Sequence, residues 1–312
     1  MKEKLNIDLR SISLKQFRTF AAVVREGAYS RAAKVLNLTP PAITFQMQQL
    51  EESVGMPLVE RTDKGLRVTD GGHEILAAAG RIEAVLSECS ENLEALSGIE
   101  GGRVTVGIVS TAKYFAPRAL AEFVKDHPNV DVRLMVGNRE ETIETMRNYD
   151  LDVAVMGRPP EDFDIDSEVI GDHPHIVIGP PGHRMMNRKN IPLMELAEET
   201  FLLREQGSGT RLLMERLFMA AGANPKTGME IGSNETIKQA VMAGLGIALL
   251  SSHTVAAELQ EGRLVKLDVQ DLPVIRQWFV VKRQDKRVMP SAQALWNFLA
   301  SSGKNHFPKY GE

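Results

Sequence analysis

The chain contains a single cysteine, Cys89, among 312 residues. One thiol can neither close a disulfide within the chain nor build a cysteine-cluster metal site, which is typical of a protein from a reducing compartment. Long hydrophobic runs are also missing, because the longest, residues 240–250, is interrupted by glycines and falls short of the roughly 20 residues of a membrane span. The first ten residues lack an apolar stretch. We therefore expect no secretory signal, no membrane contact and a cytoplasmic location.

Motifs of known catalytic chemistry are missing as well. The sequence contains no G-x-S-x-G, no H-E-x-x-H and no phosphate-loop lysine, and the Gly-x-Gly at residues 244–246 is too short to indicate a dinucleotide site. His173 and His175 flank Pro174 with no other ligand nearby in the sequence, so we expect surface residues rather than a metal site. The sequence therefore predicts no enzyme activity, no metal ion and no bound cofactor.

Charge is unevenly distributed along the chain. The whole chain has a net charge of −4, yet residues 1–68 hold 11 Lys and Arg against 7 Asp and Glu, a net charge of +4. The remaining residues hold 26 against 34, a net charge of −8. A chain of this length exceeds one small domain. We expect two or three globular units, with the phosphate-binding surface in the basic first one.

Residues 30–55 contain two short helical patterns joined by a tight turn. Ser30 is expected to cap the first helix and Thr39 the second, whose opening prolines need no hydrogen-bond donor. Apolar residues at helical spacing define the inner face of the second helix, namely Ile43, Met47, Leu50 and Val54. The opposite face carries short, neutral side chains that can contact base edges in the major groove of DNA. The alternative is a helical hairpin in an ordinary bundle.

The flanking segments complete a DNA-binding unit. Residues 14–26 place Leu14, Phe17, Phe20, Ala21 and Val24 at helical spacing after a serine, which predicts a first helix packed behind the other two. Residues 57–69 contain Lys-Gly between two β-prone runs, which predicts a hairpin. Its basic side chains either contact phosphates or are ordinary surface residues. The predicted DNA interface comprises Ser30, Arg31, Thr39, Pro41, Thr44, Phe45, Gln48, Arg61, Lys64 and Arg67.

Residues 69–96 lack proline and are rich in Ala, Glu and Leu, which predicts a helix of roughly 42 Å at about 1.5 Å per residue. Apolar residues recur in alternating steps of four and three, the pattern of a coiled-coil seam. The seam positions are Ile75, Ala79, Ile82, Leu86, Cys89, Leu93 and Leu96. We expect this helix to dimerise the chain, and the alternative is an amphipathic helix lying on its own domain. Residues 97–102 are glycine-rich and are expected to form a linker.

Beyond residue 102, β-prone runs alternate with helical patterns, which predicts a mostly parallel sheet in an α/β domain. The expected strands are residues 104–109, 130–136, 153–156, 175–178, 201–203, 228–231, 247–250 and 276–281. The expected helices are residues 117–125, 140–147, 210–221, 235–243 and 291–299, and the last ten residues are expected to fray. Such a sheet binds ligands at the carboxyl ends of its strands.

Polar side chains follow several predicted strands. Ser110, Thr111 and Lys113 follow the first strand, Asn138 and Arg139 the second, and Asn234 opens a helix, although each could serve only as a helix cap. Residues 204–211, REQGSGTR, gather glycines, hydroxyl groups and Arg211 at a helix start, which favours an anion. The alternative makes Arg211 a structural partner of Glu205 or Glu215. The predicted ligand site comprises Ser110, Thr111, Lys113, Asn138, Glu205, Ser208, Thr210, Arg211 and Asn234.

The run LKQFRTFAAVVREGAYSRAAKVLNLTPPAITFQMQQLEESVGMPLVERTDKGLRVTDGG resembles the N-terminal domain of the LysR-type transcriptional regulators. The resemblance implies a winged helix-turn-helix at residues 1–68, a coiled-coil linker helix at 69–98 and an effector domain at 99–312. That domain would have a fold like the periplasmic binding proteins, with subdomain I at about 99–170 and 271–302 and subdomain II at about 171–270. Two strands would cross between the subdomains, and we place them near residues 169–172 and 268–272.

The same resemblance implies double-stranded promoter DNA, a small-molecule effector and a dimer of dimers, with RNA polymerase as a further partner. The runs LLREQGSGTR and GSNETIKQAVMAGLGIALLSSHTV resemble the CbbR branch of this family, regulators of the Calvin-cycle RuBisCO operon. This branch implies phosphorylated sugars, related metabolites or NADPH as effectors. We therefore expect a ligand-responsive regulator of carbon-fixation genes. The alternatives are a LysR-type regulator of another metabolic operon, or a solute-binding protein or small transferase using the same α/β domain.

Overall fold

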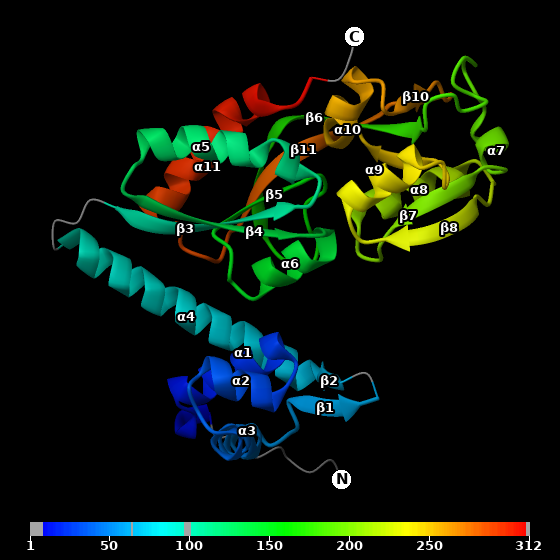
Figure 1. The fold of residues 1–312 in the computed structure, drawn as a ribbon. Coiled ribbons are helices and arrows are strands. Elements are labelled where there is room, and N and C mark those ends of the chain that lie inside the picture. Colours follow the sequence, from blue (N-terminus) through cyan, green and yellow to red (C-terminus); the bar gives the residue numbers. More distant parts are fainter. Residues whose placement is uncertain (1–8, 64, 97–100, 310–312) are drawn as a thin grey trace. The chain divides into compact units, whose positions relative to one another are not determined.

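A computed structural model of the chain describes residues 9–63, 65–96 and 101–309. The chain forms two compact units, Met1–Asn92 and Leu93–Glu312 (Figure 1). Lys64 and most of the predicted linker, residues 97–100, lie outside the described residues. Within the described ranges, none of the helices combines the length and the apolar character that a membrane crossing requires.

The first unit is helical with one small hairpin. Its elements are η1 (Leu9–Ser11), α1 (Leu14–Glu26), α2 (Tyr29–Val35), α3 (Pro40–Val54), β1 (Val59–Thr62), β2 (Gly65–Val68) and α4 (Asp70–Leu96). Thr39 caps α3 as predicted, because its hydroxyl accepts the Ala42 N–H at 3.4 Å. The predicted cap at Ser30 is wrong. Gly27, in the left-handed conformation, ends α1 so abruptly that α2 already begins at Tyr29, and Ser30 lies inside the helix.

The core of the first unit is formed by the inner faces of its helices. The four predicted residues of α3 are each at most 4% exposed. The predicted inner face of α1 is confirmed at Phe20, which is fully buried, and Phe17, Ala21 and Val24 pack against the core. The buried face is nevertheless rotated, because the predicted Leu14 is 42% exposed whereas Val23 is fully buried. In this orientation the buried Thr19 hydroxyl of α1 donates a hydrogen bond to the side-chain oxygen of Gln46 on α3.

Helix α4 divides the predicted seam into two parts. Ile75 and Ala79 are buried, and Ile75 packs into the core of the first unit. Leu86 and Leu93 are 38% and 59% exposed, and Cys89 is exposed as well. The side chain of Leu96 lies outside the described part. The first turns therefore lie on their own domain, as the alternative held, and the later positions leave an apolar stripe exposed.

The second unit is built on one seven-stranded sheet and a separate strand pair. The sheet has the order β10-β6-β11-β5-β3-β4, and β9 also pairs with β6. Its strands are β3 (Gly102–Val109), β4 (Val130–Gly137), β5 (Val153–Met156), β6 (Ile165–Gly179), β9 (Ala248–Ser251), β10 (Val265–Leu267) and β11 (Val274–Arg283). Strand β3 runs parallel to β4 and β5, whereas every pairing of β6 and β11 is antiparallel, so the sheet is mixed rather than mostly parallel. The separate pair, β7 (Thr200–Arg204) with β8 (Lys226–Ile231), is parallel.

Strands β6 and β11 are the two crossing strands. The whole of β11 pairs with residues 165–175 of β6, and Asp172 lies opposite Gln277. The first predicted crossing, residues 169–172, therefore lies within β6. The second, residues 268–272, is wrong, because Asp271 adopts a left-handed conformation with φ 61° and Pro273 cannot donate to a strand ladder. The second crossing is made instead by the residues of β11 opposite the first.

Helices cover both faces of the sheet, with α5 and α11 on one face of β3, β4 and β5 and α6 on the other (Figure 1). The helices are η2 (Ala112–Tyr114), α5 (Ala116–Asp126), α6 (Arg139–Arg147), α7 (Leu193–Leu196), α8 (Gly209–Ala220), α9 (Asn234–Met242), α10 (Ser252–Gln260), α11 (Pro290–Ser302) and η3 (Gly303–His306). Elements α7, α10 and β10 were not predicted. The expected fraying is contradicted as far as Phe307, whose ring packs 4.7 Å from that of Phe115.

Candidate functional site

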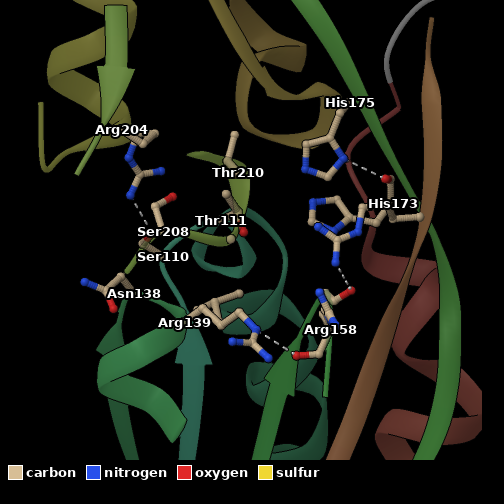
Figure 2. Close-up of a pocket in the computed structure, with 14 residues that line it drawn as sticks. Ser110, Thr111, Asn138, Arg139, Arg158, His173, His175, Arg204, Ser208 and Thr210 are labelled. Carbon is tan, nitrogen blue, oxygen red and sulfur yellow. Dashed lines mark hydrogen bonds between the residues drawn. The ribbon is translucent and has the colours of Figure 1, made fainter. Parts of the chain in front are cut away.

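A cleft lies where four strand ends of the second unit meet the crossing strands β6 and β11 (Figure 2). The strands that end there are β3, β4, β5 and β7, in agreement with the rule for open α/β sheets. The free space between the lining side chains is about 380 Å³, including the part open to solvent. Five predicted residues line it, namely Ser110, Thr111, Asn138, Ser208 and Thr210.

Four arginines line the same cleft, namely Arg139, Arg158, Arg204 and Arg276, and no Asp or Glu of the described residues does. Arg139 donates to the main-chain oxygens of Arg158 and Pro159, both at 3.2 Å, and Arg276 to that of Gly157 at 3.3 Å. Burial, followed by the positive charge of Arg158, lowers the pKa of both Arg139 and Arg276. Arg158 pairs with Glu161 at 2.7 Å and Arg204 with Glu205 at 2.8 Å, whereas Arg139 and Arg276 have no carboxylate partner among the described residues. This excess of positive charge favours an anionic ligand.

Arg204 at the end of β7 is held in place by two residues that were predicted to bind the ligand. It is 3% exposed, and its guanidinium donates to both carboxylate oxygens of Glu205 at 2.8 and 2.9 Å and to the side-chain oxygen of Asn234. It also donates to the Ser110 hydroxyl at 3.1 Å. Glu205 and Asn234 do not line the cleft. The structure gives both residues a role in positioning Arg204, because a buried guanidinium needs acceptors, and their contact with the ligand stays a prediction.

Two further predicted ligand residues, Arg211 and Lys113, point elsewhere. Arg211 on α8 donates to Glu215 at 2.8 Å, to Glu230 at 2.5 Å and to the main-chain oxygen of Arg204 at 3.1 Å. Hydrogen bonds to these two carboxylates raise the pKa of Arg211. The structure supports the structural alternative for this residue. The Lys113 ammonium lies 5.2 Å from the centre of the Tyr114 ring, outside the lining of the cleft.

His173 and His175, which were expected on the surface, are 4% and 1% exposed and line the cleft from β6. Burial, followed by the nearby charge of Arg276, lowers the pKa of His175 to about 3. The alternation His-Pro-His before an apolar run could have placed both rings on one face of a strand. Arg158 could have been found by the same strand-end rule as Asn138. Nothing local in the sequence indicates Arg276.

The outer face of α3 in the first unit presents its predicted residues to solvent. Pro41, Thr44 and Gln48 are exposed, and the Phe45 ring is 59% exposed. The Thr44 hydroxyl donates to the Pro40 carbonyl at 3.1 Å. These side chains form a neutral surface that is available to base edges.

Basic residues outside α3 are exposed as well. Arg67 pairs with Glu60 across the hairpin at 2.6 Å, and Arg61 is exposed on the same hairpin. Ser30 and Arg31 are exposed at the start of α2, where Arg31 donates to the Glu26 carbonyl at 2.7 Å. Exposed ion pairs contribute little to stability, so these arginines can exchange their partners for phosphates at little cost.

Both units match family models. Residues 14–73 match the bacterial regulatory helix-turn-helix protein, lysR family, and residues 97–304 match the LysR substrate binding domain. The chain therefore belongs to the LysR family of transcriptional regulators.

Several relatives are similar over nearly the whole chain. The HTH-type transcriptional regulator CbbR of Xanthobacter flavus is 51% identical over 299 residues, which cover 95% of this chain and 90% of that protein. CfxR of Cupriavidus necator is 44% identical over 93% of this chain and 92% of its own length. The RuBisCO operon transcriptional regulator of Allochromatium vinosum is 42% identical over 93% of this chain and 96% of its own.

Solved structures resemble the chain as well. The CcmR regulatory domain of Synechocystis PCC6803, solved in complex with 2-PG, is 37% identical, has a TM-score of 0.63, and the match covers 65% of this chain and 98% of that one. CbnR, a LysR family transcriptional regulator, has a TM-score of 0.64 at 23% identity, over 94% of this chain and 99% of that one. The second likeness shows the fold alone.

Proposed function

We propose that the protein regulates carbon-fixation genes by binding promoter DNA through α3 and the β1 and β2 hairpin, and that it senses a small anionic metabolite in the cleft. The relatives named as CbbR and as RuBisCO operon regulators support the class of genes. The observation that carries the sensing function is a cleft lined by four arginines and, among the described residues, by no carboxylate.

The size and polarity of the cleft favour a phosphorylated or carboxylated metabolite over NADPH. The free space of about 380 Å³ includes the part open to solvent, so the enclosed part is smaller and suits a small metabolite better than a dinucleotide. Helices α6 and α8 begin at the cleft, and the positive ends of their dipoles add to the attraction for an anion. The related CcmR domain, in complex with 2-PG, makes 2-PG the first compound to test.

The ligand would act by bridging the two sides of the cleft. Two hydrogen bonds already join these sides, from Arg204 to Ser110 at 3.1 Å and from the Glu140 N–H to the Gly207 carbonyl at 3.2 Å. An anion held by Arg204 on one side and Arg139 on the other would strengthen this closed form. The anion changes DNA binding only as far as its affinity for the closed form of the cleft differs from its affinity for an open form.

The proposal includes a cytoplasmic oligomer on DNA, with RNA polymerase as a further partner. The exposed stripe at Leu86 and Leu93 on α4 supports a dimer joined by this helix. Recognition helices read two-fold operators best as pairs. A dimer of dimers is the arrangement that we expect from the family.

Calorimetry and gel-shift on the protein's own upstream DNA test the proposal, with 2-PG, sugar phosphates and NADPH as ligands. Arg139→Gln should weaken binding of the effector by about 10- to 150-fold, the equivalent of roughly 1.5 to 3 kcal/mol for one charge-assisted contact. DNA binding without effector should persist. Arg188→Gln is the matched control, because it removes the same charge from an exposed pair with Glu195. Equal affinity of Arg139→Gln and wild type would exclude the cleft as the effector site.

A further inference from the structure

His173 has unused hydrogen-bonding capacity in the wall of the cleft. Its side chain is on β6, is 4% exposed, and neither ring nitrogen has a hydrogen-bond partner among the described residues. A neutral imidazole carries one donor and one acceptor, and buried polar atoms are nearly always paired. An orphaned ring that lines a ligand cleft indicates a contact that the ligand completes.

The ring is held rigidly in this position. It stacks on Trp278 with ring centres 3.7 Å apart and planes inclined by 17°. A Cβ atom at Gly157 would lie 2.7 Å from the His173 Nδ1, so only a glycine there allows this placement. Because stacking and the close backbone already fix this side chain, binding a partner costs it little further conformational entropy.

The titratable groups that surround His173 are arginines and two further histidines. Arg276 on β11 is its direct cross-strand partner, and Arg158 after β5 and Arg139 at the start of α6 line the same cleft. His175 and His253 lie with ring centres 4.2 and 6.3 Å away.

These surroundings keep the ring of His173 neutral. Burial, then His175, His253 and Arg276, lower its pKa well below the usual value. The carboxylate of the neighbouring Asp172 accepts from the Gln277 amide at 2.9 Å, and it acts on His253 rather than on His173. A bound anion would reverse the sign of the local field and favour a charged ring.

We propose that His173 donates a hydrogen bond to an acidic group of the effector and takes up one proton from solvent when that group binds, so that effector affinity rises as the pH falls. This inference rests on the proposed function of the cleft. The ligand class is a phosphate-like or sulfate-like dianion. No covalent bond changes, and the proton moves from water or buffer to a ring nitrogen.

Sulfate is the probe, because it does not titrate near neutral pH whereas phosphate does. Calorimetry of the full chain between about pH 8 and 6 should show a dissociation constant for sulfate that falls with pH, at most about tenfold per pH unit for one linked proton. The binding heat should vary with the ionisation enthalpy of the buffer, which counts the protons taken up. His173→Gln should bind sulfate more weakly and without this pH dependence. His183→Gln, which changes a histidine 3.6 Å from Glu199 and outside the cleft, should behave as wild type.

The outcomes separate this inference from the proposed function. Sulfate binding by wild type that is independent of pH and buffer overturns the role of His173 and leaves an anion cleft in place. A pH dependence that persists in His173→Gln assigns the proton to another group and also overturns it. If His173→Gln does not fold, His173→Asn takes its place in the same measurements, and a binding heat of wild type that does not vary with the buffer still overturns the role of His173. An absence of sulfate binding at every pH contradicts the anion cleft itself.

Discussion

The outer face of α3 exposes a large apolar ring, whereas the cleft of the second unit buries polar side chains, both charged and neutral. Phe45 is 59% exposed, while Arg204 and His173 are 3% and 4% exposed. Folded proteins usually show the reverse, so both departures indicate surfaces that a partner completes. An exposed apolar ring on a helix suits a large partner with its own groove, and hidden cations suit a small anion. The two units thus differ in the size of the partner that each requires.

The first way to test this contrast is to place a charge on the apolar stripe of α4. Leu86→Glu should dissociate the dimer and lower operator affinity, because an unpaired charge buried in a coiled coil costs several kcal/mol. Sedimentation measures the mass. Val85→Glu is the control, since Val85 is 64% exposed and lies next to the seam rather than in it. An unchanged mass for Leu86→Glu would show that this stripe does not need a second chain.

The second test concerns the buried polar groups of the second unit. Burial lowers the pKa of His175 to about 3 and that of His253 to about 4, from an ordinary value of 6.5. The unfolded chain therefore takes up protons below about pH 6.5 that the folded chain refuses, so stability is kept above that pH and falls below it. Each of the two histidines should lower the free energy of unfolding by about 2 kcal/mol as the pH falls from about 7 to 5.

Urea unfolding followed by tryptophan fluorescence checks this expectation, because both tryptophans, Trp278 and Trp296, belong to the second unit. Over the same pH interval, the free energy of unfolding of His253→Gln should fall by about 2 kcal/mol less than that of wild type. Equal losses would mean that His253 titrates normally in the folded protein, and the contrast between the exposed apolar ring and the buried polar groups would weaken.

The third test addresses the exposed ring. Phe45→Ala should weaken binding to the cognate operator by roughly 1 kcal/mol and leave binding to random DNA unchanged, because an apolar base contact carries sequence information. Gel-shift on both DNAs measures the difference. Arg67→Ala should instead weaken both and reduce the salt slope by about one. Equal loss on both DNAs for Phe45→Ala would assign the ring a structural role.

The smallest effect is expected from replacing Arg211. This test distinguishes the structural role of this arginine of α8 from the ligand role of the arginines that line the cleft. Arg211→Gln should lower stability by at most about 1 kcal/mol and leave the dissociation constant of the effector unchanged, because its partners Glu215 and Glu230 lie outside the cleft. Calorimetry and thermal unfolding give both values. A large loss of effector affinity would restore the sequence-based prediction of an anion contact.

The sequence by itself determined the local elements of the chain. The bounds of α1, residues 14–26, the cap at Thr39 and the buried face of α3 all follow from residues at most four positions apart. The strand ends that supply Ser110 and Asn138 to the cleft could be predicted for the same reason, since a short apolar run and the polar residue after it are neighbours. These features depend on periodicity and capping, which can be identified from the sequence alone.

Only the tertiary structure decided which charged groups share the cleft. Arg276 faces His173 because β11 pairs with β6 in a register that joins segments about 100 residues apart. Arg211 does not line the cleft, and its guanidinium donates instead to Glu230 of β8, which is 19 residues further along the chain. The periodicity of the sequence does not predict such pairings, because they form only when separate segments pack together. Each buried charge then pairs with a group that packing brings close to it.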